Sequence, residues 1–245
     1  MSETLKQSFS LNNRDEVIKF ETMADTYAQQ KILFPLKHIS LIDAYDFCQI
    51  KEDGAKLFTA LLDIYINFLM LWSDNMSASR AWGDGTATDN LESGSIFDSE
   101  EKFFRKMELH RYHTSFIFRY RALWDKAMGF SVLFFVPNEY ENFIKAKSKR
   151  NRFKKIFSSD QIYPNDFVSF LDEHLDEFEN KLRTPEAHGT GALRKRSFAM
   201  QSINDDENPS IEFIKYWNFM TLMMIAVGTL FSPDKKVAAM KIFNE

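Results

Sequence analysis

The sequence predicts an all-α protein, a helical bundle with an N-terminal helical extension and a short C-terminal helix. Apolar residues recur at steps of three and four over several long stretches, which is the periodicity of a helix with one buried face. The chain of 245 residues has only 8 glycines and 6 prolines, too few for the many turns of a β architecture. A hydrophobic content of 44%, with 25 phenylalanines, supplies an ample core.

Five main helices are expected, over residues 14–30, 52–81, 99–136, 164–182 and 211–231. The second has a buried stripe at steps of 3, 4, 3 and 4: Phe58, Leu61, Tyr65, Phe68 and Trp72. The third should end at Pro137, since proline cannot continue a helix. On the fourth, His174 lies beside the apolar stripe and is expected to be a hydrogen-bonded core histidine. The last is nearly apolar all round and should be the central helix.

The remaining segments are polar or interrupted. Residues 1–13 are expected to be disordered, residues 32–42 to form a loop around Pro35, and residues 82–98 to form a loop rich in Gly, Asp, Ser and Thr. A short amphipathic helix is expected over 235–243. These features suggest an extension over 1–50 and a bundle domain over 51–245.

Charge and cysteine usage limit the function classes. The formal net charge is −4, so any contact with nucleic acid must come from a local basic patch. Cys48 is the single cysteine, which excludes an intramolecular disulfide and a cysteine-based metal cluster. The first residues lack the features of a signal peptide, and the apolar run 216–231 is shorter than the ~20 residues that span a bilayer. A cytoplasmic protein without membrane association is expected.

One short polar segment, residues 182–198, combines Arg183 and His188 with glycines and a basic triplet. Thr184 has the character of a helix N-cap, followed by Pro185 at the first helical position. In an unbroken helix, residues five apart point about 140° away from each other. Arg183 and His188 therefore converge on one phosphate only if the backbone turns between them or a second chain supplies a partner.

This Arg-x4-His spacing after a third bundle helix resembles the HEPN superfamily (higher eukaryotes and prokaryotes nucleotide-binding domains), in its bacterial R-x4-6-H form. The stretch FRYRALWDKAMG, residues 118–129, is similar to the second helix of some bacterial members, and the final apolar helix lies where that fold ends. The resemblance covers roughly residues 50–232.

The resemblance implies a metal-independent endoribonuclease without a cofactor. His188 would act as general acid or base for attack of the ribose 2′-OH, and Arg183 would stabilise the charged phosphorane. It also implies a homodimer, with defence or toxin–antitoxin biology and a cognate antitoxin protein as the setting. Thr184 stands where the family has a more strongly polar residue, and Pro185 is unusual within the motif. A catalytically inactive module that binds RNA, nucleotide or protein is therefore the alternative.

Other residues were assigned to supporting or competing functions. Asp125 either bonds inside the bundle or supports the site, together with Thr184. Arg105 and His110 repeat the motif spacing, but they lie in a continuous helical pattern and are expected on its solvated surface. His110 and His113, three residues apart, would supply half of a metal site, for which no third ligand is evident.

Basic residues cluster between 145 and 155, seven in eleven positions. They suggest an RNA-binding strip, in which we assign substrate contacts to Lys149, Arg150 and Arg152, and to the triplet Arg194, Lys195 and Arg196. The alternative is a solvated connector. A helical interaction protein without a nucleic-acid function is a third hypothesis, and it predicts that acids from elsewhere in the fold neutralise the strip.

Overall fold

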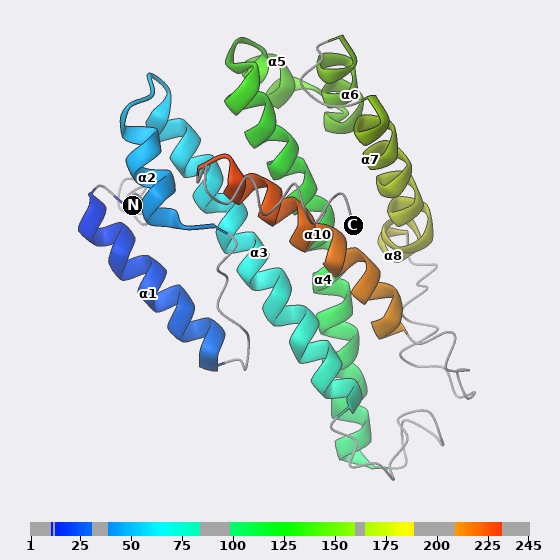
Figure 1. Cartoon of the computed structure of the whole chain (residues 1–245). Helices are drawn as coiled ribbons and strands as arrows, with labels where there is room; N and C mark the ends of the chain where they lie inside the picture. The colour runs from blue at the N-terminus through cyan, green and yellow to red at the C-terminus, as the bar shows by residue number, and fades with distance from the viewer. Residues whose placement is uncertain are drawn as a thin grey trace, which may run out of the picture. The chain divides into compact units, whose positions relative to one another are not determined.

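The computed structural model describes residues 11, 13–30, 39–83, 99–159, 165–188 and 209–231. Every regular element within these residues is a helix, so the predicted all-α fold is confirmed (Figure 1). Contacts divide the chain into two compact units: residues 1–69 with 217–245, and residues 70–216. The long helices α3 (Gly54–Gly83) and α10 (Pro209–Thr229) each contribute residues to both units. The predicted boundary at residue 50 stays a prediction.

The first unit contains α1 (Arg14–Gln30), α2 (Leu41–Gln49) and parts of α3 and α10. The prediction for α1 is confirmed, and Asn13 caps it by accepting a hydrogen bond from the Glu16 N–H. Helix α2 was not predicted, because its nine residues are too few to show a clear period. Its start has a readable signal, since the Ser40 hydroxyl accepts from the Asp43 N–H at 3.2 Å.

Aromatic pairs hold this unit together. Edge-to-face contacts join α1 to α3 through Phe20 and Tyr65, and α2 to α3 through Tyr45 and Phe58. At the turn from α2 to α3, Gly54 is required, because a Cβ there would lie 1.7 Å from the Cys48 carbonyl oxygen. The predicted stripe on α3 is buried from Phe58 to Phe68.

The second unit contains the end of α3, the start of α10 and the elements between them: α4 (Glu100–Phe135), η1 (Pro137–Glu139), α5 (Tyr140–Lys145), α6 (Lys149–Ser159), α7 (Asn165–Phe178), η2 (Glu179–Arg183) and α8 (Thr184–Ala187). The long helix predicted to end at Pro137 is confirmed as α4. Gly129 on α4 lets α5 approach, since a Cβ there would be 3.3 Å from the ring of Phe143.

An aromatic cluster around Tyr120 joins α4, α7 and α10. The Tyr120 ring contacts His174, Phe178 and Tyr216 at centroid distances of 4.6 to 6.1 Å. His174 is buried, and its Nε2 shares a 2.6 Å hydrogen bond with the Tyr120 hydroxyl. The prediction of a hydrogen-bonded core histidine is confirmed. Burial, and then the positive charge of Lys215, lower the pKa of His174 to about 4.

The helix that begins as α7 continues without a break through η2 and α8, antiparallel to α4 (Figure 1). Thr184 has helical angles (φ −65°, ψ −48°) and makes no side-chain cap, so the predicted N-cap at Thr184 is wrong. The element η2 is a π-helical turn, in which the Thr184 N–H bonds the Glu179 carbonyl five residues earlier. Because Pro185 removes one donor and its ring crowds the preceding turn, this wider turn accommodates it inside the helix.

Two apolar helices bear on the expectations for core and membrane segments. In α10, Met220, Met224 and Val227 are buried, but Asn218 and Ala226 are exposed, so the helix is not covered on all sides. Among the described residues, one stretch is long and apolar enough to cross a membrane by length and composition, and it lies in α3, at Gly54–Ser77. Since 56% of it is buried inside the protein, it also has the character of a soluble core helix. Residues 1–10, 32–38, 84–98 and 235–243, which make up most of the predicted disordered start, the two predicted loops and the predicted C-terminal helix, lie outside the described residues. The end of the first predicted loop, Leu41 and Ile42, belongs to α2 instead.

Candidate functional site

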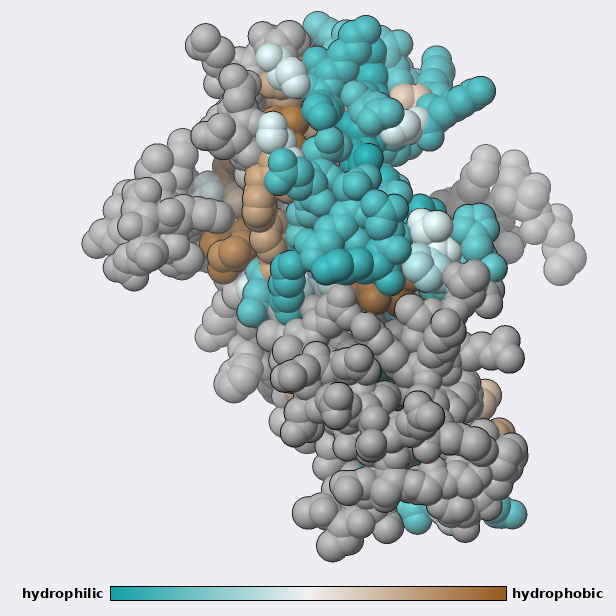
Figure 2. Space-filling model, turned by 90° about the vertical axis from the view of Figure 1, so that its right-hand side faces the viewer, coloured by the Kyte–Doolittle hydropathy of each residue, from teal (hydrophilic) through white to brown (hydrophobic). Residues whose placement is uncertain are grey.

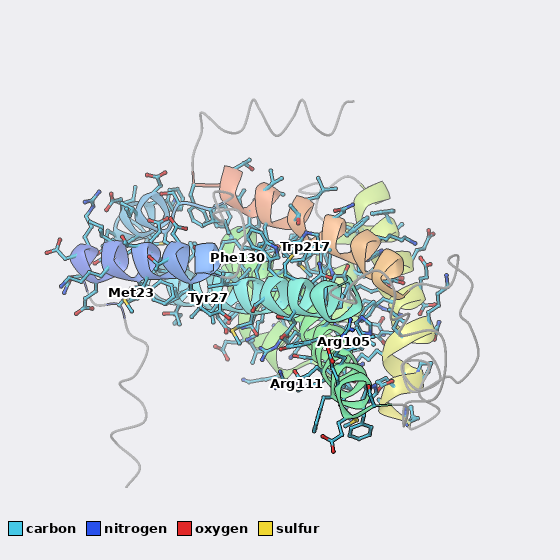
Figure 3. The ribbon with its side chains drawn as sticks, turned by 90° about the horizontal axis from the view of Figure 1, so that it is seen from below. Met23, Tyr27, Arg105, Arg111, Phe130 and Trp217 are labelled. Carbon is cyan, nitrogen blue, oxygen red and sulfur yellow. The ribbon has the colours of Figure 1, made fainter. Side chains whose placement is uncertain are left out.

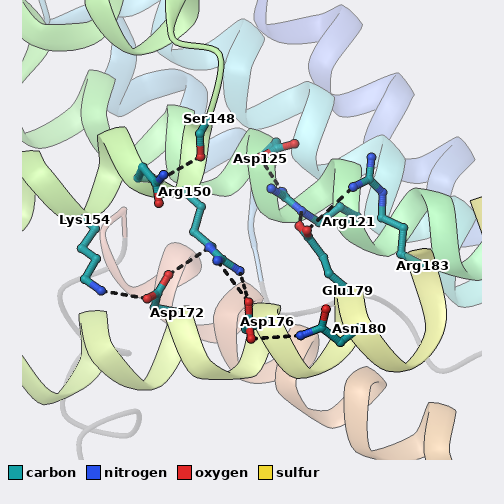
Figure 4. Close-up of polar contacts among 11 residues, drawn as sticks. Arg121, Asp125, Ser148, Arg150, Lys154, Asp172, Asp176, Glu179, Asn180 and Arg183 are labelled. Carbon is teal, nitrogen blue, oxygen red and sulfur yellow. Dashed lines mark hydrogen bonds and ion pairs between the residues drawn. The ribbon is translucent and has the colours of Figure 1, made fainter. Parts of the chain in front are cut away.

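Arg183 faces α4 and shares a carboxylate with an arginine of that helix. Its Nη1 lies 3.9 Å from Glu179 Oε2, while Arg121 Nε donates to Glu179 Oε1 at 2.5 Å (Figure 4). The side chain of Arg183 is 42% exposed, whereas that of Arg121 is only 11% exposed. Arg183 is thus positioned by a carboxylate and retains an accessible guanidinium, the group that binds phosphate oxygens.

Asp125 is connected to this pair. Arg121 Nη1 donates to Asp125 Oδ1, so one buried guanidinium joins Asp125 on α4 to Glu179 on η2. Burial acts to lower the pKa of Arg121, but the charges and hydrogen bonds of Asp125 and Glu179 outweigh it and raise that pKa. Two interpretations of Asp125 stood open, a bond inside the bundle and support of the site, and its contact with Arg121 fits both.

His188 lies at the other end of the motif. It is exposed, and its N–H bonds the Thr184 carbonyl at 3.0 Å, which closes the last turn of α8. No turn separates Arg183 from His188, so their side chains leave the helix about 140° apart. The backbone turn that would let them converge within one chain is absent. The second arrangement, a partner chain, is the one that would bring the two groups together.

Glu186, inside the motif, contacts α4 through two residues that sequence reasoning did not assign to the site. Its Oε1 accepts from Thr114 Oγ1 at 3.3 Å and lies 4.0 Å from His110 Nε2. The side chain of His110 is 26% exposed, so this part of the α4 surface, expected to be solvated, is partly covered. Nothing in the sequence indicates this contact, because it joins positions more than seventy residues apart.

The basic strip on α5 and α6 is largely paired. Arg150 bonds Asp172 and Asp176 of α7 at 3.0 and 3.2 Å, and Lys154 bonds Asp172 at 2.8 Å (Figure 4). Arg152 pairs with Glu139 of η1, and Lys149 donates to the carbonyls of Phe143 and Ile144 at the end of α5. The surface over α6 and α7 is mainly hydrophilic (Figure 2). The three strip residues assigned to substrate contacts therefore also serve the fold.

The other assigned positions offer less. Arg194, Lys195 and Arg196 lie outside the described residues, and Thr184 is exposed without a capping bond. His113 is fully buried, unlike its neighbour His110. The described part of the chain contains no group of three or more His, Cys, Asp or Glu side chains arranged to hold a metal ion.

No protein-family model, no curated protein and no solved structure matches the chain.

Proposed function

We propose that this protein is a HEPN-like endoribonuclease that cleaves RNA without a metal ion, using Arg183 and His188. The observation that supports it best is the docking of the motif against α4. Glu179 and Glu186, which bracket Arg183, contact Arg121 and Thr114 of the helix that carries the FRYRALWDKAMG stretch. The Arg-x4-His segment and the helix with the FRYRALWDKAMG stretch, which together carry the resemblance, thus pack against each other.

The reaction requires two kinds of group. The ribose 2′-OH attacks the adjacent phosphorus, its proton passes to a base, and the bond to the 5′-oxygen breaks as that oxygen receives a proton. Arg183 stabilises the charge on the non-bridging oxygens, and His188 exchanges a proton. The products are a 2′,3′-cyclic phosphate and a 5′-hydroxyl.

Because Arg183 and His188 leave one helix about 140° apart, the proposed enzyme is a homodimer. Arg183 of one chain then faces His188 of the other, and the two-fold axis creates two equivalent sites. A cognate antitoxin protein that covers these sites belongs to the same proposal.

The test is incubation of the purified protein with mixed RNA in EDTA, beside His188→Ala and Arg183→Ala. Lys181→Ala, an exposed change on the same helix, is the matched control. We expect cleavage that survives chelation, leaves 2′,3′-cyclic phosphate, and disappears in both site variants but not in the control. Intact RNA with measurable RNA binding would instead favour an inactive binding module and point to Thr184 and Pro185 as the reason.

A helical interaction protein without an RNA substrate is the second candidate. The pairing of Arg150, Arg152 and Lys154 with acids of α7 and η1 favours it, because a neutralised strip attracts phosphates weakly. RNA affinity measured at 50 and 200 mM salt separates the two candidates. A steep loss of affinity with salt supports a strip that binds phosphates, and no detectable binding at either salt supports the interaction protein.

A further inference from the structure

The environment of Glu186 suggests a second imidazole for the proposed reaction. The Glu186 side chain is 10% exposed, and its Oε2 is buried with no hydrogen-bond donor among the described residues. A buried acceptor without a donor is unfavourable and rare in folded proteins, so it requires a reason.

The imidazole of His110 lies beside this carboxylate. Its Nε2 lies 4.0 Å from Glu186 Oε1, close enough that a small rotation of the carboxylate would bring it into hydrogen-bond range. Catalytic hydrogen bonds are often long before substrate binds and tighten in the complex. Thr114, one turn further along α4, holds the carboxylate beside His110 through its 3.3 Å bond to the same oxygen.

The position of His110 matches that of Arg183 better than the position of His188 does. Arg183 precedes Glu186 by three residues and so lies about 60° from it around the helix, one turn away. His188 follows Glu186 by two residues and lies about 200° around, on the side away from α4. Within one chain, His110 therefore contacts the side of the helix from which Arg183 projects, and His188 lies on the other side.

The other arginine near His110 does not compete for this pairing. Arg105, five residues earlier on α4, points about 140° away from His110, for the same reason that separates Arg183 from His188. Arg105 and Arg111 lie on different sides of the helix (Figure 3). The repeated Arg-x4-His spacing on α4 thus contributes its histidine, but not its arginine, to the region around Arg183.

We infer that His110, positioned by Glu186, is the second acid–base residue of the proposed ribonuclease and acts on the same phosphate as Arg183 of its own chain. The inference rests on the proposed function. Cleavage moves two protons, one from the 2′-OH and one to the 5′-oxygen, and His188 of the partner chain and His110 divide these transfers. No metal ion or co-reactant is needed for the balance.

Steady-state cleavage of a short RNA by the full chain tests this inference. His110→Ala should lower kcat about 100-fold with KM changed by less than about twofold, because acid–base catalysis contributes roughly that factor to the chemical step. Glu186→Gln should lower kcat about tenfold. Glu108→Gln, on the other side of α4 and half exposed, is the matched control and should leave both constants unchanged. Imidazole added to His110→Ala should restore part of kcat.

Each contrary result has a separate meaning. An inactive wild-type protein contradicts the proposed function and this inference with it. Wild-type cleavage that His110→Ala leaves intact overturns the inference alone. A loss of kcat in His110→Ala that imidazole does not relieve, with a lowered melting temperature, assigns His110 a structural function only and also overturns the inference.

Discussion

At the scale of single residues, the buried pair of Tyr120 and His174 makes stability depend on pH. The pKa of His174 is about 4, lowered first by burial and then by Lys215, against about 6.5 in an unfolded chain. Between these pH values His174 binds a proton in the unfolded state but not in the folded state. The free energy of unfolding therefore falls as the pH decreases from about 6.5 to about 4.

We therefore predict that this pair contributes a loss of about 2 kcal/mol in the free energy of unfolding between pH 7 and pH 5. Urea unfolding at both values measures it. His174→Gln removes the titrating group, so its free energy of unfolding should change much less over the same interval, although the variant is less stable at pH 7. An equal change in both proteins would contradict this explanation.

Arg121 carries a second prediction at this scale. Its nearly buried guanidinium joins Asp125 and Glu179, so Arg121→Met leaves two carboxylates close together without their shared cation. We expect a loss of about 2 kcal/mol, below the value for a fully buried pair because both carboxylates are partly exposed. Chemical denaturation measures it. Lys181→Met, which breaks an exposed pair with Glu177, should cost less than about 0.5 kcal/mol.

At the scale of elements, the π-helical turn is explained by one residue. Pro185 sits in the interior of a continuous helix, where proline costs up to about 3 kcal/mol relative to alanine. Part of that cost is already relieved by the wider turn, so Pro185→Ala should stabilise the fold by about 1 kcal/mol and raise Tm by about 2–4 °C. Thermal unfolding followed by circular dichroism tests this. A lower Tm would mean that Pro185 stabilises the motif as it stands.

In the turn between α2 and α3, by contrast, a substitution by alanine is expected to destabilise the protein. A methyl group on Gly54 would overlap the Cys48 carbonyl, and backbone atoms cannot move aside cheaply. Gly54→Ala should therefore destabilise the protein by about 2 kcal/mol or more, although alanine is the better helix former. Ala55→Gly, the reverse change at the exposed neighbouring position, should cost about 1 kcal/mol. Equal stability of Gly54→Ala and the wild type in urea would contradict the overlap.

Periodicity predicted long elements well and local junctions poorly. The stripes that identify α3 and α4 extend over many turns, so their period is unambiguous, and the ends of those helices were predicted to within one or two residues. The nine residues of α2 are too short for that signal. Thr184 precedes a proline, and this local sequence favours a helix cap. The packing of Leu182 and Glu186 against the rest of the second unit overrides that preference and keeps Thr184 helical. The contact between Glu186 and His110 depends on tertiary structure alone.

At the scale of the whole molecule, the unbroken helix from Arg183 to His188 makes the proposed activity depend on the formation of a homodimer. If one site uses Arg183 of one chain and His188 of the other, each single variant is inactive as a homodimer. A mixed dimer of Arg183→Ala and His188→Ala chains keeps one site with both groups intact. Random exchange makes half of the dimers mixed, each with one of two sites active, so about a quarter of wild-type activity should return.

The same mixing experiment locates His110. Arg183 and His110 are inferred to serve one site from one chain, so in a mixed dimer of Arg183→Ala and His110→Ala each site lacks one of them, and activity should not return. Each pair of variants is unfolded and refolded together as a separate mixture, and RNA cleavage in EDTA is then measured for both mixtures. Recovery in the second mixture would place His110 across the dimer from Arg183, and recovery in neither would show that the active unit is not a dimer exchanging Arg183 and His188.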